Sequence, residues 1–226
     1  AMDLRFFEIY RNPDYLVLLA EGAAMSAGLT VAAGLTGLVL ATLLATARFH
    51  AVPVLGHLAA AYVEFIRNTP LIVQLFFVAF GLPQLLGYSW PFWGHALLAL
   101  TLNFSAYFSE ILRAGFTTVA EGQYEAARAL GLRPFTIFRR IVLPQAMQRM
   151  FPSLSSQFIF LFLTTGIIAE IGVRDLTQAG LFIDSRTFRS FEVFLTLTAI
   201  YVGMSLAFKT ALALAHRYLF PAVAAR

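Results

Sequence analysis

The chain has 226 residues, of which 59% are hydrophobic and 12% are charged, and its formal net charge is +4 at pH 7. Soluble domains carry roughly 25% charged residues, so this composition excludes an ordinary soluble protein and predicts an integral membrane protein. The positive charge does not indicate nucleic-acid binding, because in a membrane protein its distribution along the chain carries the information. Cysteine is absent, which excludes a disulfide framework and thiol chemistry.

Residues 1–20 carry charges throughout and contain no apolar run typical of a cleavable signal peptide. The segment predicts a short interfacial helix lying on the membrane, broken near Asn12 and Pro13. A transmembrane domain over residues 21–219 and a cytoplasmic tail over residues 220–226 complete the predicted organisation.

A helix needs about 20 mostly apolar residues to cross a bilayer, and five segments reach this length. The second of them contains the motif Asn68-Thr69-Pro70, which predicts a kink because proline removes a backbone donor. The fold is therefore predicted to be all-α, with the chain ends on opposite sides of the membrane. The predicted spans are residues 23–47, 58–82, 92–115, 152–171 and 191–216.

The distribution of basic residues sets the predicted orientation. With the N-terminus outside, the inner segments hold ten of the sixteen Lys and Arg and the outer segments hold five, while Arg67 lies within a span. Cytoplasmic segments carry the excess of positive charge, so the polar interval over residues 118–150 is predicted to be cytoplasmic.

This polar interval predicts two short amphipathic helices. Residues 124–130 (YEAARAL) are mostly strong helix formers, and Gly131 follows where a helix end takes a positive φ angle. Pro134 suits the first turn of a second helix, and Pro144 either ends that helix or starts the next. We expect the two helices to dock on a partner, and the alternative is a solvated connector.

Several motifs occur in a fixed order along the chain, and together they resemble one family. They are Thr30, the stretch YVEFIRNTPLIVQLFF at residues 62–77, Ala106-Tyr107 with Glu110 and Arg113, Gly122-Gln123, and Glu125-Ala126-Ala127 followed by Gly131, Ile141 and Pro144. This set resembles the polar amino acid branch of the permease subunits of type I ATP-binding-cassette (ABC) importers, whose cytoplasmic EAA loop has the last pattern. The resemblance covers about residues 19–219.

The resemblance implies a five-helix, MetI-like transmembrane fold in which the EAA loop forms a coupling helix that sits in a groove on a separate ATPase. The coupling residues that it implies are Tyr124, Glu125, Ala126, Ala127, Gly131, Arg139 and Pro144. It also implies an ABC ATPase dimer that binds ATP and Mg²⁺, a second permease subunit (identical or homologous), a periplasmic amino-acid-binding protein and a place in the bacterial inner membrane. The expected substrate is a polar amino acid, and no cofactor in this chain and no nucleic-acid partner are expected.

No catalytic constellation is visible in the sequence. Lys209 is the only lysine and no glycine-rich stretch precedes it, which excludes a Walker-type phosphate loop. The four histidines lack metal-ligand spacing. If ATP drives this protein, another chain must hydrolyse it, and this chain is predicted not to be an enzyme.

Polar residues inside a membrane are expensive and are therefore candidates for function. Asn103, Tyr107 and Glu110 share one face of the third span at i, i+4 and i+7, and Asn103 and Tyr107 are candidate substrate-binding residues. The alternative for these two is hydrogen bonding between helices. Glu110 is expected to pair with Arg113, and Glu64 with Arg67.

The fourth span adds Thr164, Thr165 and Glu170 as candidate substrate-binding residues. The resembled family usually has a Lys-Asp-Thr-Ser-Leu-like run here, whereas this chain has Leu-Thr-Thr-Gly-Ile at residues 163–167 and an acidic residue further on. A carboxylate at residue 170 favours a cationic amino acid as the substrate. The alternative is that it pairs with Arg174 or is solvated.

The outer segment over residues 175–192 mixes both signs of charge and is predicted to dock the binding protein, the alternative being a solvated loop. Three other functions are weighed against the ABC permease. They are a membrane scaffold or receptor subunit that binds an ATPase without carrying solute, a secondary amino acid transporter, and a membrane-embedded enzyme. The last lacks any nucleophile–base pair in the sequence.

Overall fold

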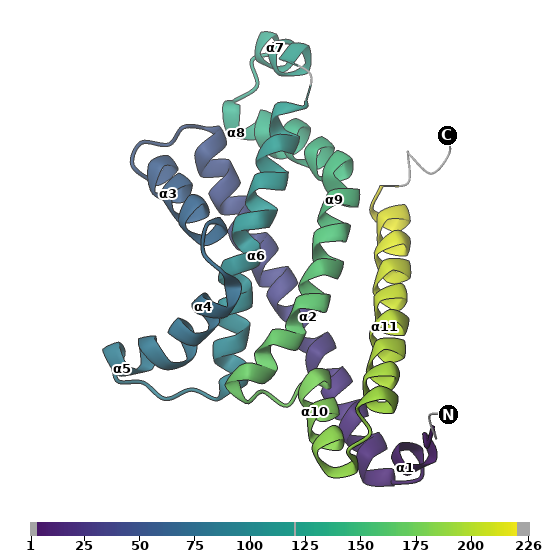
Figure 1. Ribbon diagram of the computed structural model, residues 1–226. Helices are drawn as coiled ribbons and strands as arrows, with labels where there is room; N and C mark the ends of the chain where they lie inside the picture. Colours follow the sequence, from purple (N-terminus) through teal and green to yellow (C-terminus); the bar gives the residue numbers. More distant parts are fainter. Residues whose placement is uncertain (1–3, 120, 221–226) are drawn as a thin grey trace. The chain divides into compact units, whose positions relative to one another are not determined.

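The computed structural model describes residues 4–119 and 121–220, and all regular elements within these residues are helical (Figure 1). The chain divides into two compact units that are described separately. The first comprises Ala1–Leu35, Pro70–Thr101 and Phe158–Thr210, and the second comprises Thr36–Thr69, Leu102–Gln157 and Ala211–Arg226.

The N-terminal region contains the short helix α1 (Phe7–Tyr10) and the long helix α2 (Pro13–Phe49). Asn12 caps α2, since its Oδ1 accepts a hydrogen bond from the backbone N–H of Asp14 at 3.0 Å. The predicted break near Asn12 and Pro13 is confirmed. However, α2 begins well before residue 23 and has 37 residues, which makes it about 55 Å long at 1.5 Å per residue.

The first unit also contains α4 (Leu71–Phe76), the π-helix η1 (Phe77–Gly81), α5 (Leu82–Leu86), the 3₁₀ helix η3 (Thr165–Ile171), α10 (Leu176–Thr187) and most of α11 (Ser190–Leu219). In Figure 1, α1 and α10 lie beside the start of α2 and the start of α11. One buried cluster joins these four helices, and it consists of Ile9, Leu19, Leu176, Ala179, Ile183, Val193 and Leu197.

The second unit contains the end of α2, α3 (Leu55–Arg67), most of α6 (Phe92–Thr117), α7 (Glu121–Ala129), α8 (Pro134–Ile137), the π-helix η2 (Phe138–Val142) and the first part of α9 (Leu143–Thr164). Val63, Ile66 and Ala106 form a buried cluster that holds α3 against α6. Tyr62 strengthens this contact, because its hydroxyl donates to the carbonyl of Leu102 at 2.8 Å.

Within residues 4–119 and 121–220, three helical segments are long and apolar enough to cross a membrane, namely Pro13–Phe49, Pro134–Ile171 and Ser190–Leu219. A fourth arises if Leu55–Arg67 and Leu71–Leu86 count as one span, and these two are separated by a bend at Asn68-Thr69-Pro70. The predicted kink is thus confirmed. The count of five spans stays a prediction, because α6 is long enough to cross a membrane but is less apolar than the other spans.

The fourth predicted span is continuous with the polar interval. Helical structure runs from Pro134 to Ile171, so the second short helix of the loop continues into the span instead of forming a separate element. Pro144 is the second residue of α9 and follows the π-helical turn Phe138–Val142. A wider turn relieves the clash between a proline ring and the preceding turn, so the helix continues through Pro144.

Candidate functional site

The end of α7 is built as a Schellman motif, which fixes the turn between the two loop helices. The N–H of Gly131 donates to the carbonyl of Arg128 at 2.9 Å, and the N–H of Leu132 donates to the carbonyl of Ala127 at 3.2 Å. Gly131 has a φ of 74°, in the left-handed region that side chains rarely adopt. The sequence prediction for this turn is therefore confirmed.

The predicted coupling residues divide by exposure. Ala127 is only 3% exposed and faces its own chain, where α7 packs on α8 and η2. The exposed ones are Glu125, Ala126, Gly131, Arg139 and Pro144, while Tyr124 is half-buried. Two large apolar side chains that were not among the coupling residues, Leu130 and Phe135, are 80% and 70% exposed. This surface, named the α7–α8 surface below, includes Glu125, Ala126, Leu130, Gly131 and Phe135.

An aromatic cluster fixes the base of this segment. The ring of Phe138 in η2 lies 5.2 Å from that of Phe116, 4.9 Å from that of His50 and 6.1 Å from that of Phe49. These rings come from the end of α2, the residue that follows it and the end of α6, so the loop helices are held on the second unit by packing as well as by chain connection.

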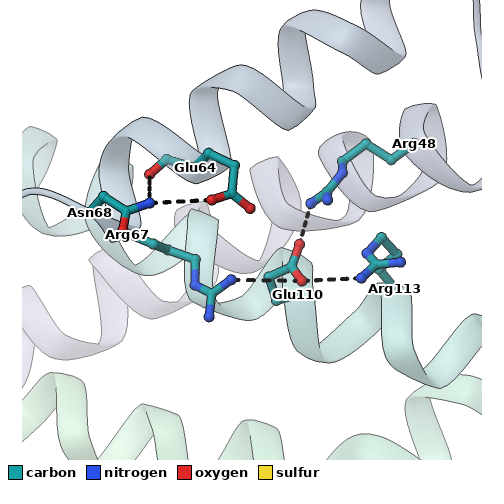
Figure 2. Close-up of polar contacts among 6 residues, drawn as sticks. All are labelled: Arg48, Glu64, Arg67, Asn68, Glu110 and Arg113. Atoms are coloured by element: carbon teal, nitrogen blue, oxygen red, sulfur yellow. Dashed lines mark hydrogen bonds and ion pairs between the residues drawn. The ribbon is translucent and has the colours of Figure 1, made fainter.

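The most concentrated charge in the second unit lies around Glu110 of α6. Figure 2 shows Arg48 of α2, Arg67 of α3 and Arg113 of α6 directed toward its carboxylate. Arg48 donates a hydrogen bond to Oε1, while nitrogens of Arg113 and Arg67 lie 3.3 Å and 3.8 Å from Oε2. We name these four residues the Glu110 cluster. The predicted Glu110–Arg113 pair is confirmed, and two further arginines share the same acid.

The predicted pair of Glu64 and Arg67 is wrong. Glu64 instead accepts a hydrogen bond from the side-chain amide of Asn68 at 3.2 Å (Figure 2). Arg67 points toward Glu110 and lies over the ring of Tyr107, 5.7 Å from its centre. In this position the guanidinium of Arg67 contacts both the carboxylate of Glu110 and the ring of Tyr107, whereas Glu64 would offer it a carboxylate alone.

The two candidate substrate residues of α6 differ in burial. Asn103 is 4% exposed, and Tyr107, one turn further on, is half-buried beneath Arg67. Tyr107 therefore shares the polar face of α6 with Asn103 and also contacts Arg67 of the Glu110 cluster.

The candidates of the fourth span lie in the first unit. The hydroxyl of Thr164 donates to the carbonyl of Phe160 at 2.6 Å, and that of buried Thr165 donates to the carbonyl of Phe162 at 2.7 Å. Glu170 lies on the 3₁₀ helix η3 and is exposed, and in the described part of the chain no ion pair joins it to Arg174. Its carboxylate is accordingly open to solvent and to solutes.

Sequence reasoning missed a buried acid at the start of α10. Asp175 is fully buried, and its Oδ1 accepts a hydrogen bond from the N–H of Gln178 at 2.9 Å. Its Oδ2 has no partner among the described residues. The spacing Asp-x-x-Gln before an apolar helix is a capping signal, which predicts that Asp175 caps the helix but does not predict its burial. Its burial arises from α2, since a Cβ on Gly22 would lie 2.7 Å from the carbonyl oxygen of Asp175.

The burial of Asp175 reduces the surface that the predicted docking segment over residues 175–192 presents, while docking of a binding protein there stays a prediction. Both ends of the segment point inward, because Asp175 is fully buried and Glu192 is only 4% exposed. Glu192 accepts a hydrogen bond from the backbone N–H of Arg5 at 3.0 Å. Exposed positions remain between them, including Arg186 and Phe188.

Burial raises the pKa of Asp175 to about 6, although backbone N–H donors from Gln178 and Thr177 oppose the shift. Because the folded state holds this proton more tightly than the unfolded chain, the stabilisation is present below the unfolded pKa of about 4 and is lost as the pH rises through 6. We expect the free energy of unfolding in detergent to fall by up to about 3 kcal/mol between pH 4 and pH 6.5. Asp175→Asn should remove this dependence, whereas Asp184→Asn on the same helix should retain it. Equal slopes in all three chains would contradict the prediction.

Residues 34–225 match the family described as the binding-protein-dependent transport system inner membrane component. The chain belongs to this family. It is an ABC transporter permease and a multi-pass protein of the inner membrane, and the resemblance to the polar amino acid branch is confirmed.

Among relatives of this permease, the octopine transport system permease protein OccM of Rhizobium meliloti is 36% identical over 208 residues, which cover 88% of this chain and 84% of that protein. The L-cystine transport system permease protein TcyL of Bacillus subtilis is 36% identical over 77% of this chain and 76% of its own. A crystal structure of an amino acid ABC transporter with histidines matches with a TM-score of 0.85 and 35% identity, covering 96% of this permease and 100% of that chain. The MetNI methionine transporter, at 20% identity and a TM-score of 0.79, covers 92% and 99% and supports the fold alone.

Proposed function

We propose that this permease carries a polar, cationic amino acid inward across the membrane, driven by ATP that a separate subunit hydrolyses. The observation that carries the proposal is the α7–α8 surface. Leu130 and Phe135 are two of the most exposed large apolar side chains of the second unit, and they flank a turn fixed by Gly131. Exposed apolar side chains on a rigid, well-packed segment are typical of a protein–protein interface.

Movement of the ATPase would be transmitted to the membrane helices through α7 and α8. The Phe138 cluster packs the loop onto the ends of α2 and α6, and the helix from Pro134 to Ile171 continues without interruption to η3. ATP binding would close two ATPase subunits, shift α7 and α8, and open the transport path outward. Hydrolysis would reverse the movement.

The proposed substrate residues are Asn103 and Tyr107 in one unit and Thr164, Thr165 and Glu170 in the other. An amino acid carries both charges, so its path needs donors for the carboxylate and an acceptor for the cation. The exposed carboxylate of Glu170 supports a cationic substrate, and histidine, which accompanies the transporter of similar structure, is an amino acid whose side chain can become cationic.

The proposed assembly contains two permease subunits, an ATPase dimer on the α7–α8 surface and an extracytoplasmic binding protein on the exposed positions of α10. The N-terminus would lie outside and the C-terminus in the cytoplasm, as the distribution of Lys and Arg favours. The relatives, which are transport permeases, support this arrangement.

Co-expression with candidate ATPase and binding-protein subunits, followed by reconstitution in vesicles, tests the function. We expect ATP hydrolysis to be stimulated by the binding protein loaded with a cationic amino acid, together with uptake of that amino acid. ATPase association without solute-stimulated hydrolysis or uptake would favour a scaffold or receptor subunit. Uptake driven by an ion gradient without an ATPase would favour a secondary transporter.

Glu170→Gln tests the substrate within the same vesicles. Loss of a charge-assisted hydrogen bond, worth about 1.5–3 kcal/mol, should lower kcat/KM for a cationic amino acid by about tenfold or more and affect a neutral one much less. Glu21→Gln is the matched control, since Glu21 is also an exposed acid of the first unit. Equal uptake by the two variants would remove Glu170 from the site.

A further inference from the structure

The Glu110 cluster contains more positive charge than its one carboxylate neutralises. Three guanidiniums surround Glu110, and the nearby Glu64 is held by Asn68 instead of by an arginine. Arg48 and Arg113 each use a single nitrogen on Glu110, although a guanidinium has five N–H donors. The Nε of Arg113 is buried and has no partner among the described residues. A buried, unsatisfied donor of this kind costs free energy unless an acceptor joins it.

An open pocket of about 300 Å³ lies beside two of these arginines. Arg48, Arg113 and His57 provide its polar lining, and the remaining walls are small and apolar: Ala51, Val52, Gly56 and Ala60. All of these residues belong to the second unit, and they lie at the end of α2, in the turn that follows, in α3 and on α6. The volume is at the lower limit of ligand pockets, roughly 300 Å³, and suits a small anionic group better than a whole nutrient.

We propose that this pocket binds the phosphate of an anionic phospholipid, with the forks of Arg48 and Arg113 as donors. The pocket opens where α2 ends, which the proposed orientation puts at the cytoplasmic membrane surface. Basic pockets between transmembrane helices on that side bind acidic headgroups, and arginine pairs with phosphate through parallel N–H bonds. The proposal rests on this orientation but not on the identity of the transported solute.

Lipid association measured on the isolated full chain tests the site without any transport assay. Spin-labelled phosphatidylglycerol and phosphatidylcholine are compared in vesicles that contain the wild-type chain, and the wild type should prefer phosphatidylglycerol. Arg113→Gln should lower this preference about fivefold, because one arginine near an anionic lipid contributes about 1 kcal/mol. Arg113→Lys should retain most of it.

Arg67→Gln provides the matched control. Arg67 also contacts Glu110, and its side chain is 39% exposed against 41% for Arg113, but it does not line the pocket. It should keep the preference for phosphatidylglycerol. Equal losses in the two glutamine variants would overturn the site, because general surface charge would then explain the preference.

A second variant leaves every charge in place. Ala60→Leu fills the pocket from its apolar wall and should abolish the preference, which keeps the proposal testable if Arg113→Gln fails to fold. An unchanged preference in Ala60→Leu would overturn the proposal. Inorganic phosphate is added as a final arm, and displacement of the labelled lipid by phosphate alone would assign the site to the free anion instead of the lipid.

Discussion

A chain that carries Leu130→Asp is expected to lose its stable association with the partner ATPase while its membrane helices remain folded. Leu130 is 80% exposed beside the Gly131 turn, so the isolated chain loses almost no packing when it is replaced. In a complex the aspartate would be buried without a partner, and a central contact of this kind contributes at least about 2 kcal/mol, which corresponds to roughly thirtyfold in affinity. Co-purification of the tagged ATPase with the permease measures the loss.

Phe188→Asp is the control for this prediction. Phe188 is 86% exposed, it is also a large apolar side chain, and it lies at the end of α10 in the other unit. It should leave the ATPase attached even if binding-protein docking changes. Normal co-purification of Leu130→Asp would instead show that the α7–α8 surface is not the docking surface.

The two loop helices α7 and α8 and the turn between them could be predicted because the signals that build them are local. A helix-forming run, a glycine at the helix end and Pro134 at the next start lie within about a dozen residues, and each acts through the backbone around it. The direction in which Ala127 faces could not be predicted in this way. Its burial depends on α8 and η2, which the sequence does not orient relative to α7.

The contacts of the Glu110 cluster could be predicted only in part. Arg113 is three residues from Glu110, so their pairing followed from helix spacing. Arg48 is 62 residues away, and the assignment of Arg67 to Glu64 failed because the closest acid in sequence is not the one that its helix faces. Helical spacing identifies neighbours on one helix, but neighbours on different helices depend on how α2, α3 and α6 pack.

The burial of Asp175 could not be predicted from the sequence either. Its capping signal was visible in the sequence, whereas its charged neighbourhood suggested an exposed docking loop. The contacts that bury it come from α2, and Ser26 accepts a hydrogen bond from the backbone N–H of Leu176 at 3.2 Å across 150 residues. Long-range contacts of this kind decide burial, and a single sequence does not reveal them.

Glu110→Ala is expected to destabilise the chain more than any other single substitution in this cluster. The side chain of Glu110 is 22% exposed and that of Arg48 only 14%, so removal of the acid leaves a largely buried arginine without its partner and two more arginines repelling it. Breaking a buried ion pair from one side costs about 3–5 kcal/mol, and partial exposure here lowers the expected loss to about 2–3 kcal/mol. Chemical unfolding of the detergent-solubilised chain measures this loss.

Further variants separate the effect of the excess arginine charge on stability from the effect of lost packing. Glu110→Gln keeps the volume of the side chain but not its charge, so it should lose nearly as much stability as Glu110→Ala. Adding Arg48→Leu to Glu110→Ala should recover part of the loss, because the uncompensated buried cation disappears. Glu64→Ala, which removes an exposed acid whose carboxylate is hydrogen-bonded to Asn68, should change stability by no more than about 0.5 kcal/mol. If Glu110→Gln were as stable as the wild type, the carboxylate would not be what holds the three arginines together.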